Sequence, residues 1–184
     1  MSLIRRPDVR IPDLTRLSQF ERGADDYRGY VGADANYDLL SGLQFNVLFA
    51  LGMQKTHRVL DLGCGSLRVG RLLIPYLQAG NYYGVEPNKW LVDEGIAHNV
   101  GADLAALRKP NFLYVDDFSV GQFGVKFDFV VANSIFSHTF RDLARTSLPR
   151  VADVLSEKGL FALTFVDERY GSPLLVIRSC VWAL

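Results

Sequence analysis

Residues 59–70 constrain the fold of this chain more than any other stretch. They read Val-Leu-Asp-Leu-Gly-Cys-Gly-Ser-Leu-Arg-Val-Gly, an apolar strand that ends near an acidic residue and runs directly into a glycine-rich turn. Gly63 and Gly65 lack a Cβ atom where the backbone must bend sharply and lie against a ligand. The segment 67–77 has the pattern of a helix whose first N–H groups face the turn. This order of elements indicates an α/β fold with a nucleotide-like ligand at the turn.

The glycine spacing departs from two common phosphate-binding motifs. In the dinucleotide fingerprint G-x-G-x-x-G, the third glycine stands where this chain has Arg68. A P-loop requires a lysine where this chain has Arg71. Asp61 would repel a pyrophosphate and suits a cationic or hydroxyl-bearing ligand. These departures favour S-adenosylmethionine, which carries an ammonium, a sulfonium and no phosphate, and leave an NAD- or nucleoside-binding domain as the alternative.

The acidic and glycine positions together resemble the class I S-adenosylmethionine-dependent methyltransferases. The match rests on Asp61-x-Gly63-x-Gly65 and on Glu86, which closes the next predicted strand. Glu86 lies about 20 residues beyond Gly65, the separation that returns a carboxylate to the side of a ribose. A longer frame, made of residues 63–68, 82–84 and 134–138, resembles a bacterial subgroup of small-molecule methyltransferases. The resemblance extends over about residues 27–167.

The resemblance implies a cofactor site at the carboxyl ends of the strands. Asp61, Gly63 and Gly65 would hold the amino-acid end of the cofactor, unless Asp61 caps a helix or pairs with Arg68. Glu86 would accept hydrogen bonds from the ribose hydroxyls. For the adenine amino group the family places an acid after the third strand. Asp116 and Asp117 are both candidates here, with Asp117 preferred, and Phe118 would lie on the adenine face or in the core. The other predicted cofactor contacts are Cys64, Pro87, Asn133 and Ser134.

The acceptor side of the site is less defined by the sequence. His138 is the candidate general base for a substrate hydroxyl, because the pKa of histidine is near neutral pH; the alternative is a histidine that orients its loop or contacts the cofactor. Tyr27 and Tyr30 would line a substrate pocket or pack the N-terminal segment. After the fourth strand, Asn133 begins Asn-Ser-Ile-Phe rather than the Asn/Asp-Pro-Pro-Tyr/Phe motif of base- and glutamine-methylating enzymes. We therefore expect O- or N-methylation of a small molecule.

Charge and cysteine usage exclude several partners. The chain has 20 basic and 20 acidic residues, so no overall field attracts nucleic acid or an anionic membrane. Cys64 lies inside the turn, where a disulfide would be awkward, and this favours a reducing cytoplasmic compartment. The 3 histidines show no metal-ligand spacing, so no metal is expected. No apolar run reaches membrane-spanning length, so we expect no membrane partner.

Periodicity predicts alternating strands and helices. The expected strands are 58–62, 82–86, 112–115, 127–132 and 160–166, and the expected helices are 36–51, 67–77, 88–107 and 141–156. This alternation predicts a Rossmann-like, doubly wound, mostly parallel sheet. Residues 1–55 would form an N-terminal arm and helical cap, and residues 56–184 the S-adenosylmethionine-binding domain.

The C-terminal segment is short compared with the family resembled. Methyltransferases of this class usually add a helix and an antiparallel strand pair after the fifth strand, whereas 174–184 is one apolar run. The sequence therefore predicts an incomplete C-terminal strand pair. Two interpretations stay open: a truncated, non-catalytic cofactor-binding remnant, or a run that pairs with a second copy in a homodimer.

Overall fold

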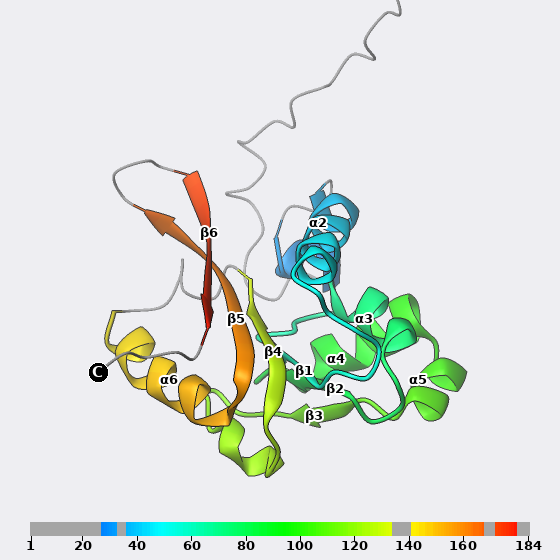
Figure 1. The fold of residues 1–184 in the computed structure, drawn as a ribbon. Coiled ribbons are helices and arrows are strands. Elements are labelled where there is room, and N and C mark those ends of the chain that lie inside the picture. Colours follow the sequence, from blue (N-terminus) through cyan, green and yellow to red (C-terminus); the bar gives the residue numbers. More distant parts are fainter. Residues whose placement is uncertain (1–26, 33–35, 134–140, 168–171, 180–184) are drawn as a thin grey trace, which may run out of the picture.

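A single mixed sheet forms the centre of the molecule. The computed structural model describes residues 27–32, 36–133, 141–167 and 172–179 (Figure 1). The 6-stranded sheet has the order β3-β2-β1-β4-β5-β6. Its strands are β1 Val59–Leu62, β2 Tyr82–Val85, β3 Asn111–Leu113, β4 Phe127–Ala132, β5 Leu155–Asp167 and β6 Ser172–Ser179. Strands β1 to β5 pair in parallel, and β6 pairs antiparallel with β5.

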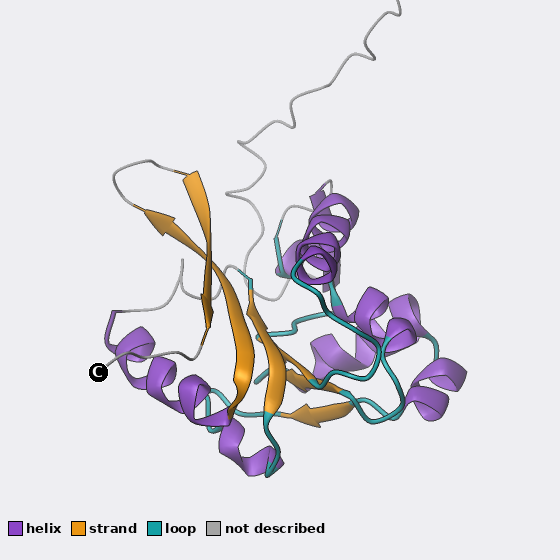
Figure 2. Cartoon of the chain, viewed as in Figure 1, coloured by secondary structure: helices purple, strands orange, loops and turns teal. Residues whose placement is uncertain are grey.

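Helices cover both faces of this sheet (Figure 2). They are α1 Tyr27–Tyr30, α2 Tyr37–Ala50, α3 Gly70–Tyr76, α4 Lys89–Gly95, the π-helical turn η3 Ile96–Val100, α5 Ala102–Arg108, the 3₁₀ turn η4 Val120–Phe123 and α6 Arg141–Val154. No helix in the described ranges is both long enough and apolar enough to cross a bilayer.

Alternate residues of β1 point into two separate cores. Val59 belongs to a cluster with Leu48 of α2 and Leu73 of α3. Leu60 belongs to a second cluster that includes Val151 of α6. Because successive side chains of a strand point to opposite faces, β1 needs apolar cover on both sides. The predicted doubly wound architecture is confirmed.

Local backbone geometry corrects the predicted helix boundaries. The helix expected over 67–77 begins only at Gly70, because Leu67 has a φ of 63° that cannot belong to a right-handed helix. The helix expected over 88–107 is divided at Gly101, whose φ is 89°. The helix expected over 36–51 is confirmed as α2. The N-terminal arm before Tyr27 lies outside the described residues.

The C-terminal apolar run finds its partner within the same chain. The strand expected in 174–184 is β6, which starts at Ser172 and pairs with β5 in the register Leu163↔Val176. The run therefore has a partner in its own chain. Because β6 is the last strand in the sheet order, pairing of its other edge with a second copy in a homodimer stays a prediction. Among the described residues one antiparallel strand follows β5.

Candidate active site

The glycine turn after β1 is fixed to the end of β2. The N–H groups of Gly63 and Cys64 both donate to the carbonyl oxygen of Val85, at 2.8 and 3.0 Å. Gly63 and Gly65 have φ values of 71° and 52°, the left-handed region that favours glycine. A Cβ atom on Gly65 would lie 2.6 Å from Cγ1 of Val31, in the segment after α1. The N-terminal segment therefore closes over the turn at a distance that only glycine permits.

Asp61 is a buried carboxylate beside this turn. Its side chain is 3% exposed, and the Tyr82 hydroxyl donates to Oδ2 at 2.8 Å. Burial raises the pKa of Asp61 to about 7, opposed by the Tyr82 hydrogen bond and the positive charge of Arg68. The main partner is thus Tyr82, which sequence reasoning missed. A signal existed, since Tyr82 begins the strand beside β1 and a diagonal neighbour on the same face is within reach of a long side chain.

Glu86 returns to the turn as its spacing predicts. Its Oε2 accepts a hydrogen bond from the Gly65 N–H at 3.1 Å, and its Oε1 accepts from the backbone and side-chain nitrogens of Asn88, both at 3.0 Å. Glu86 is only 7% exposed. A carboxylate has about four acceptor positions, so Glu86 keeps capacity for a further donor. Pro87 follows it and is exposed.

Cys64 fills the space behind the turn. Its thiol is free and 5% exposed, and burial raises its pKa well above the ordinary value. A Cβ atom on Gly84 would lie 2.9 Å from Cys64 Sγ, so β2 and the turn approach closely. A thiol that stays protonated is a poor nucleophile. The Cys64 side chain therefore packs here as a small apolar group.

The acidic pair after β3 points to solvent and to α6. Asp117 Oδ1 accepts a hydrogen bond from the Ser119 N–H at 3.0 Å. Hydrogen bonding by the side chain of Ser119, and then by its N–H, holds the pKa of Asp117 below its ordinary value. Its Oδ2 lies 3.6 Å from Nη1 of Arg150. Asp116 is exposed, whereas Phe118 is 8% exposed and packs in the second core cluster. The contacts of these residues with adenine stay predictions.

The residues predicted after β4 are described only in part. Asn133 follows β4, and its Oδ1 accepts a hydrogen bond from Thr164 of β5 at 3.0 Å. Ser134 and His138 lie outside the described residues, so their roles stay predictions.

Tyr27 and Tyr30 pack against the elements that follow Glu86. The Tyr27 ring stacks on His98 with centroids 5.4 Å apart, and the Tyr30 ring meets Trp90 edge-on at 5.2 Å. These contacts match the packing alternative, and a role of either tyrosine in a substrate pocket stays a prediction.

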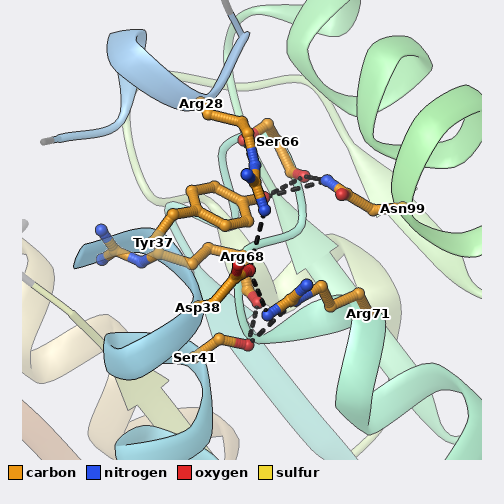
Figure 3. Close-up of polar contacts among 8 residues, drawn as sticks. All are labelled: Arg28, Tyr37, Asp38, Ser41, Ser66, Arg68, Arg71 and Asn99. Atoms are coloured by element: carbon orange, nitrogen blue, oxygen red, sulfur yellow. Dashed lines mark hydrogen bonds and ion pairs between the residues drawn. The ribbon is translucent and has the colours of Figure 1, made fainter. Parts of the chain in front are cut away.

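Four polar residues join α2 to the glycine turn, and we call Tyr37, Ser41, Ser66 and Asn99 the α2 clamp (Figure 3). The buried Tyr37 hydroxyl donates to the Ser66 carbonyl oxygen at 3.0 Å. Asn99 Nδ2 donates to the Tyr37 hydroxyl oxygen and to the Ser66 carbonyl oxygen, each at 3.0 Å. Ser41 donates to the Arg68 carbonyl at 2.5 Å. No periodicity in the sequence predicts these contacts, because the partners come from segments far apart along the chain.

Arginines surround the clamp. Arg28 and Arg71 each lie 2.7 Å from Asp38 Oδ1, and their guanidinium carbons lie 4.5 and 5.5 Å from the centroid of the Tyr37 ring. Arg71 thus forms an ion pair with Asp38, although the Asp38 side chain is 64% exposed and such a pair stabilises little. Arg68 Nη1 donates to the Val31 carbonyl at 3.1 Å.

Replacing Tyr37 by Phe tests the clamp. The change removes a buried hydroxyl that donates to the Ser66 carbonyl and accepts from Asn99 Nδ2. The free energy of unfolding, measured by urea denaturation, should therefore fall by about 1–3 kcal/mol. Tyr83→Phe is the matched control, because the Tyr83 hydroxyl has no hydrogen bond within the described part of the chain. Equal stability losses in the two variants would contradict the clamp.

Within the described ranges, no 3 or more His, Cys, Asp or Glu side chains gather into a group that could hold a metal ion. Two buried carboxylates, Asp61 and Glu86, lie at the turn, and the positive charge of Arg68 acts on Asp61. They suit a ligand with cationic and hydroxyl groups rather than a phosphate.

Comparison with solved structures shows the same fold. Magnesium protoporphyrin IX methyltransferase from Synechocystis PCC 6803, solved with bound S-adenosylmethionine, is 20% identical with a TM-score of 0.60, over 85% of this chain and 71% of that one. An S-adenosylmethionine-dependent methyltransferase from Clostridium acetobutylicum ATCC 824 is 19% identical with a TM-score of 0.58, over 76% of this chain and 54% of that one. A protein from Pyrococcus horikoshii OT3 is 21% identical with a TM-score of 0.58, over 85% of this chain and 68% of that one. The chain therefore spans between about half and 71% of these proteins.

Comparison with protein families is more specific than the likeness of fold. A search of curated proteins found no match. The family model described as a methyltransferase domain matches residues 60–161, more than half of the chain. The matched segment contains the glycine turn, Asp61, Glu86 and Asn133. The chain therefore belongs to the methyltransferase domain family.

Proposed function

We propose that this chain binds S-adenosylmethionine at the glycine turn and transfers its methyl group to a small-molecule acceptor. One observation carries the proposal: Asp61 and Glu86 are both buried, and the Glu86 carboxylate is hydrogen-bonded to the Gly65 N–H. Two buried carboxylates at one turn would repel a pyrophosphate. They would be stabilised by an ammonium and by ribose hydroxyls, and this favours S-adenosylmethionine over NAD.

The residues present fit this cofactor. Asp61 is costly to ionise where it lies, and a cofactor ammonium would add a second positive charge to that of Arg68 in stabilising its carboxylate. Glu86 would accept from ribose hydroxyls with its remaining acceptor capacity. Asn133, Ser134, Pro87 and the Asp116 to Phe118 stretch complete the proposed contacts.

Catalysis by this chain would consist mainly of positioning. S-adenosylmethionine supplies an electrophilic methyl group on its sulfonium when bound. The segment at Val31 lies directly over Gly65 and would exclude water from the turn. His138 would accept the proton of an alcohol acceptor, whereas an amine or phenol needs less assistance from a base.

The acceptor is proposed to be a small molecule methylated on oxygen or nitrogen. The balanced charge of the chain speaks against a polyanionic substrate. One structurally similar enzyme acts on a porphyrin, which is also a small molecule. We further propose a cytoplasmic location, which suits the free thiol of Cys64, and pairing of two copies at the outer edge of β6. A monomer mass in light scattering would contradict this dimer.

Isothermal titration calorimetry tests the cofactor. S-adenosylhomocysteine should bind, and NAD should not. Heat with NAD and none with S-adenosylhomocysteine would refute the proposal and support the dinucleotide alternative. Binding without turnover of any acceptor would support the non-catalytic remnant.

Changing Glu86 to Gln should weaken S-adenosylhomocysteine binding about tenfold or more, because a charged acceptor is lost and one oxygen becomes a donor. Glu94→Gln is the matched control, since Glu94 is 45% exposed and pairs only with His98 among the contacts described. Calorimetry on both variants gives the comparison. An unchanged affinity in Glu86→Gln would remove the ribose assignment.

A further inference from the structure

An apolar cavity lies between α2 and the face of β4 and β5. Its volume is about 290 Å³. Leu40, Leu43 and Val47 line it from the helix, and Val131 and Ala162 line it from the sheet. Small-molecule sites span roughly 300–1,000 Å³, so this volume is near the lower end of that range.

The polar atoms of this cavity are few and carry no charge. No charged side chain of the described residues lines it. Gln44, on α2, has its side-chain nitrogen buried, with no hydrogen-bond partner among the described residues. A buried donor without a partner is unfavourable, and an acceptor atom on a ligand would satisfy it. The Asn133–Thr164 hydrogen bond lies in the wall where β4 ends.

We propose that this cavity binds the apolar body of the methyl acceptor, and that the acceptor is an uncharged small molecule. This inference rests on the proposed function, because Asn133 both lines the cavity and is a predicted cofactor contact. A shared residue places the two ligands side by side, as methyl transfer requires. An ionised acceptor would lose its hydration in a wall that offers no counter-charge, so it would be rejected. Gln44 would donate to an oxygen or nitrogen of the acceptor.

Two fluorescent probes with the same aromatic frame test the charge preference. N-phenyl-1-naphthylamine is neutral, and 8-anilino-1-naphthalenesulfonate adds one sulfonate. In titrations of the full chain with saturating S-adenosylhomocysteine, the neutral probe should bind saturably at one site. The sulfonate should bind at least about tenfold more weakly, since its charge would be buried unpaired.

A pair of leucines on α2 tests the location. Leu43 lines the cavity and is 52% exposed, whereas Leu39 is 61% exposed and lies outside the lining. Leu43→Arg should weaken the neutral probe about tenfold or more, and Leu39→Arg should leave it within about twofold. Both side chains are exposed enough for either variant to fold, which the unchanged affinity for S-adenosylhomocysteine would verify.

The outcomes separate this inference from the proposed function. Absence of S-adenosylhomocysteine binding in the unmodified chain would refute the proposed function and, with it, the acceptor assignment. If the cofactor analogue binds, three results overturn the inference alone: no saturable signal from the neutral probe, equal affinity for both probes, or equal effects of the two arginine substitutions.

Discussion

Replacing Asp61 by Asn is expected to stabilise the ligand-free protein above pH 7 and to weaken its binding of S-adenosylhomocysteine. The pKa of Asp61 is raised from 3.8 to about 7, so the folded state holds a proton that the unfolded state has released. Stability from this group is therefore complete below pH 3.8 and is lost as the pH rises through about 7. Asn cannot ionise, and it still accepts the Tyr82 hydrogen bond.

Urea denaturation at two pH values measures the stability effect. The gain of Asp61→Asn over the unmodified protein should be larger at pH 8 than at pH 5, by about 2–3 kcal/mol. Loss of the carboxylate should weaken S-adenosylhomocysteine binding about tenfold to a hundredfold, because a charge-assisted hydrogen bond disappears. A gain independent of pH would show that Asp61 does not titrate in this range.

The affinity of the unmodified protein for S-adenosylhomocysteine should carry the same signature. Binding to the ammonium needs the ionised carboxylate, so affinity should fall by up to about tenfold per pH unit below pH 7. In Asp61→Asn this dependence should vanish. An equal dependence in both proteins would assign it to another group. The Asp61 carboxylate would thus strengthen cofactor binding while lowering the stability of the ligand-free protein.

Replacing Gly65 by Ala is expected to disrupt the site through two separable effects. The φ of 52° strains any residue with a Cβ, and that Cβ would lie 2.6 Å from Val31 Cγ1. The free energy of unfolding should fall by about 2–4 kcal/mol, and S-adenosylhomocysteine binding should be lost. Thermal and urea denaturation together with calorimetry measure both effects.

Two further variants separate strain from collision. Gly80→Ala has the strain alone, because Gly80 has a φ of 81° and nothing lies within 4 Å of its added Cβ. Val31→Ala combined with Gly65→Ala removes Cγ1, leaving Val31 Cβ at an ordinary contact distance of 3.6 Å. Gly65→Ala should lose more stability than Gly80→Ala, and the double variant should regain the difference between these two losses. Failure of this rescue would show that Val31 does not lie over the turn.

Much of the candidate site's geometry was predictable because it depends on residues close together in the sequence. Gly63, Gly65 and Asp61 are nearly adjacent, and their backbone and charge requirements can be inferred directly from the motif. Glu86 was predictable because a strand, turn and helix return the chain over a nearly fixed distance. Its hydrogen bond to the Gly65 N–H confirms that return.

The predicted helix boundaries were wrong where the torsion angle of a single residue decides them. The positive φ of Leu67 delays α3 to Gly70, and no periodic pattern signals a left-handed leucine. The pairing of β6 with β5 could not be predicted from the sequence either, because an apolar run is equally compatible with a partner strand in its own chain or in another.

By itself, the sequence determined the α/β class, the doubly wound sheet and the chemical character of the turn after β1. Those depend on periodicity and on neighbouring residues. Only the tertiary structure decided that Tyr82 holds Asp61, that Val31 covers Gly65, and that Tyr37 fastens α2 to Ser66. It also decided the uncharged cavity beneath α2. Such contacts join segments that are far apart in the chain. They depend on how side chains pack in three dimensions, and no local sequence pattern encodes that packing.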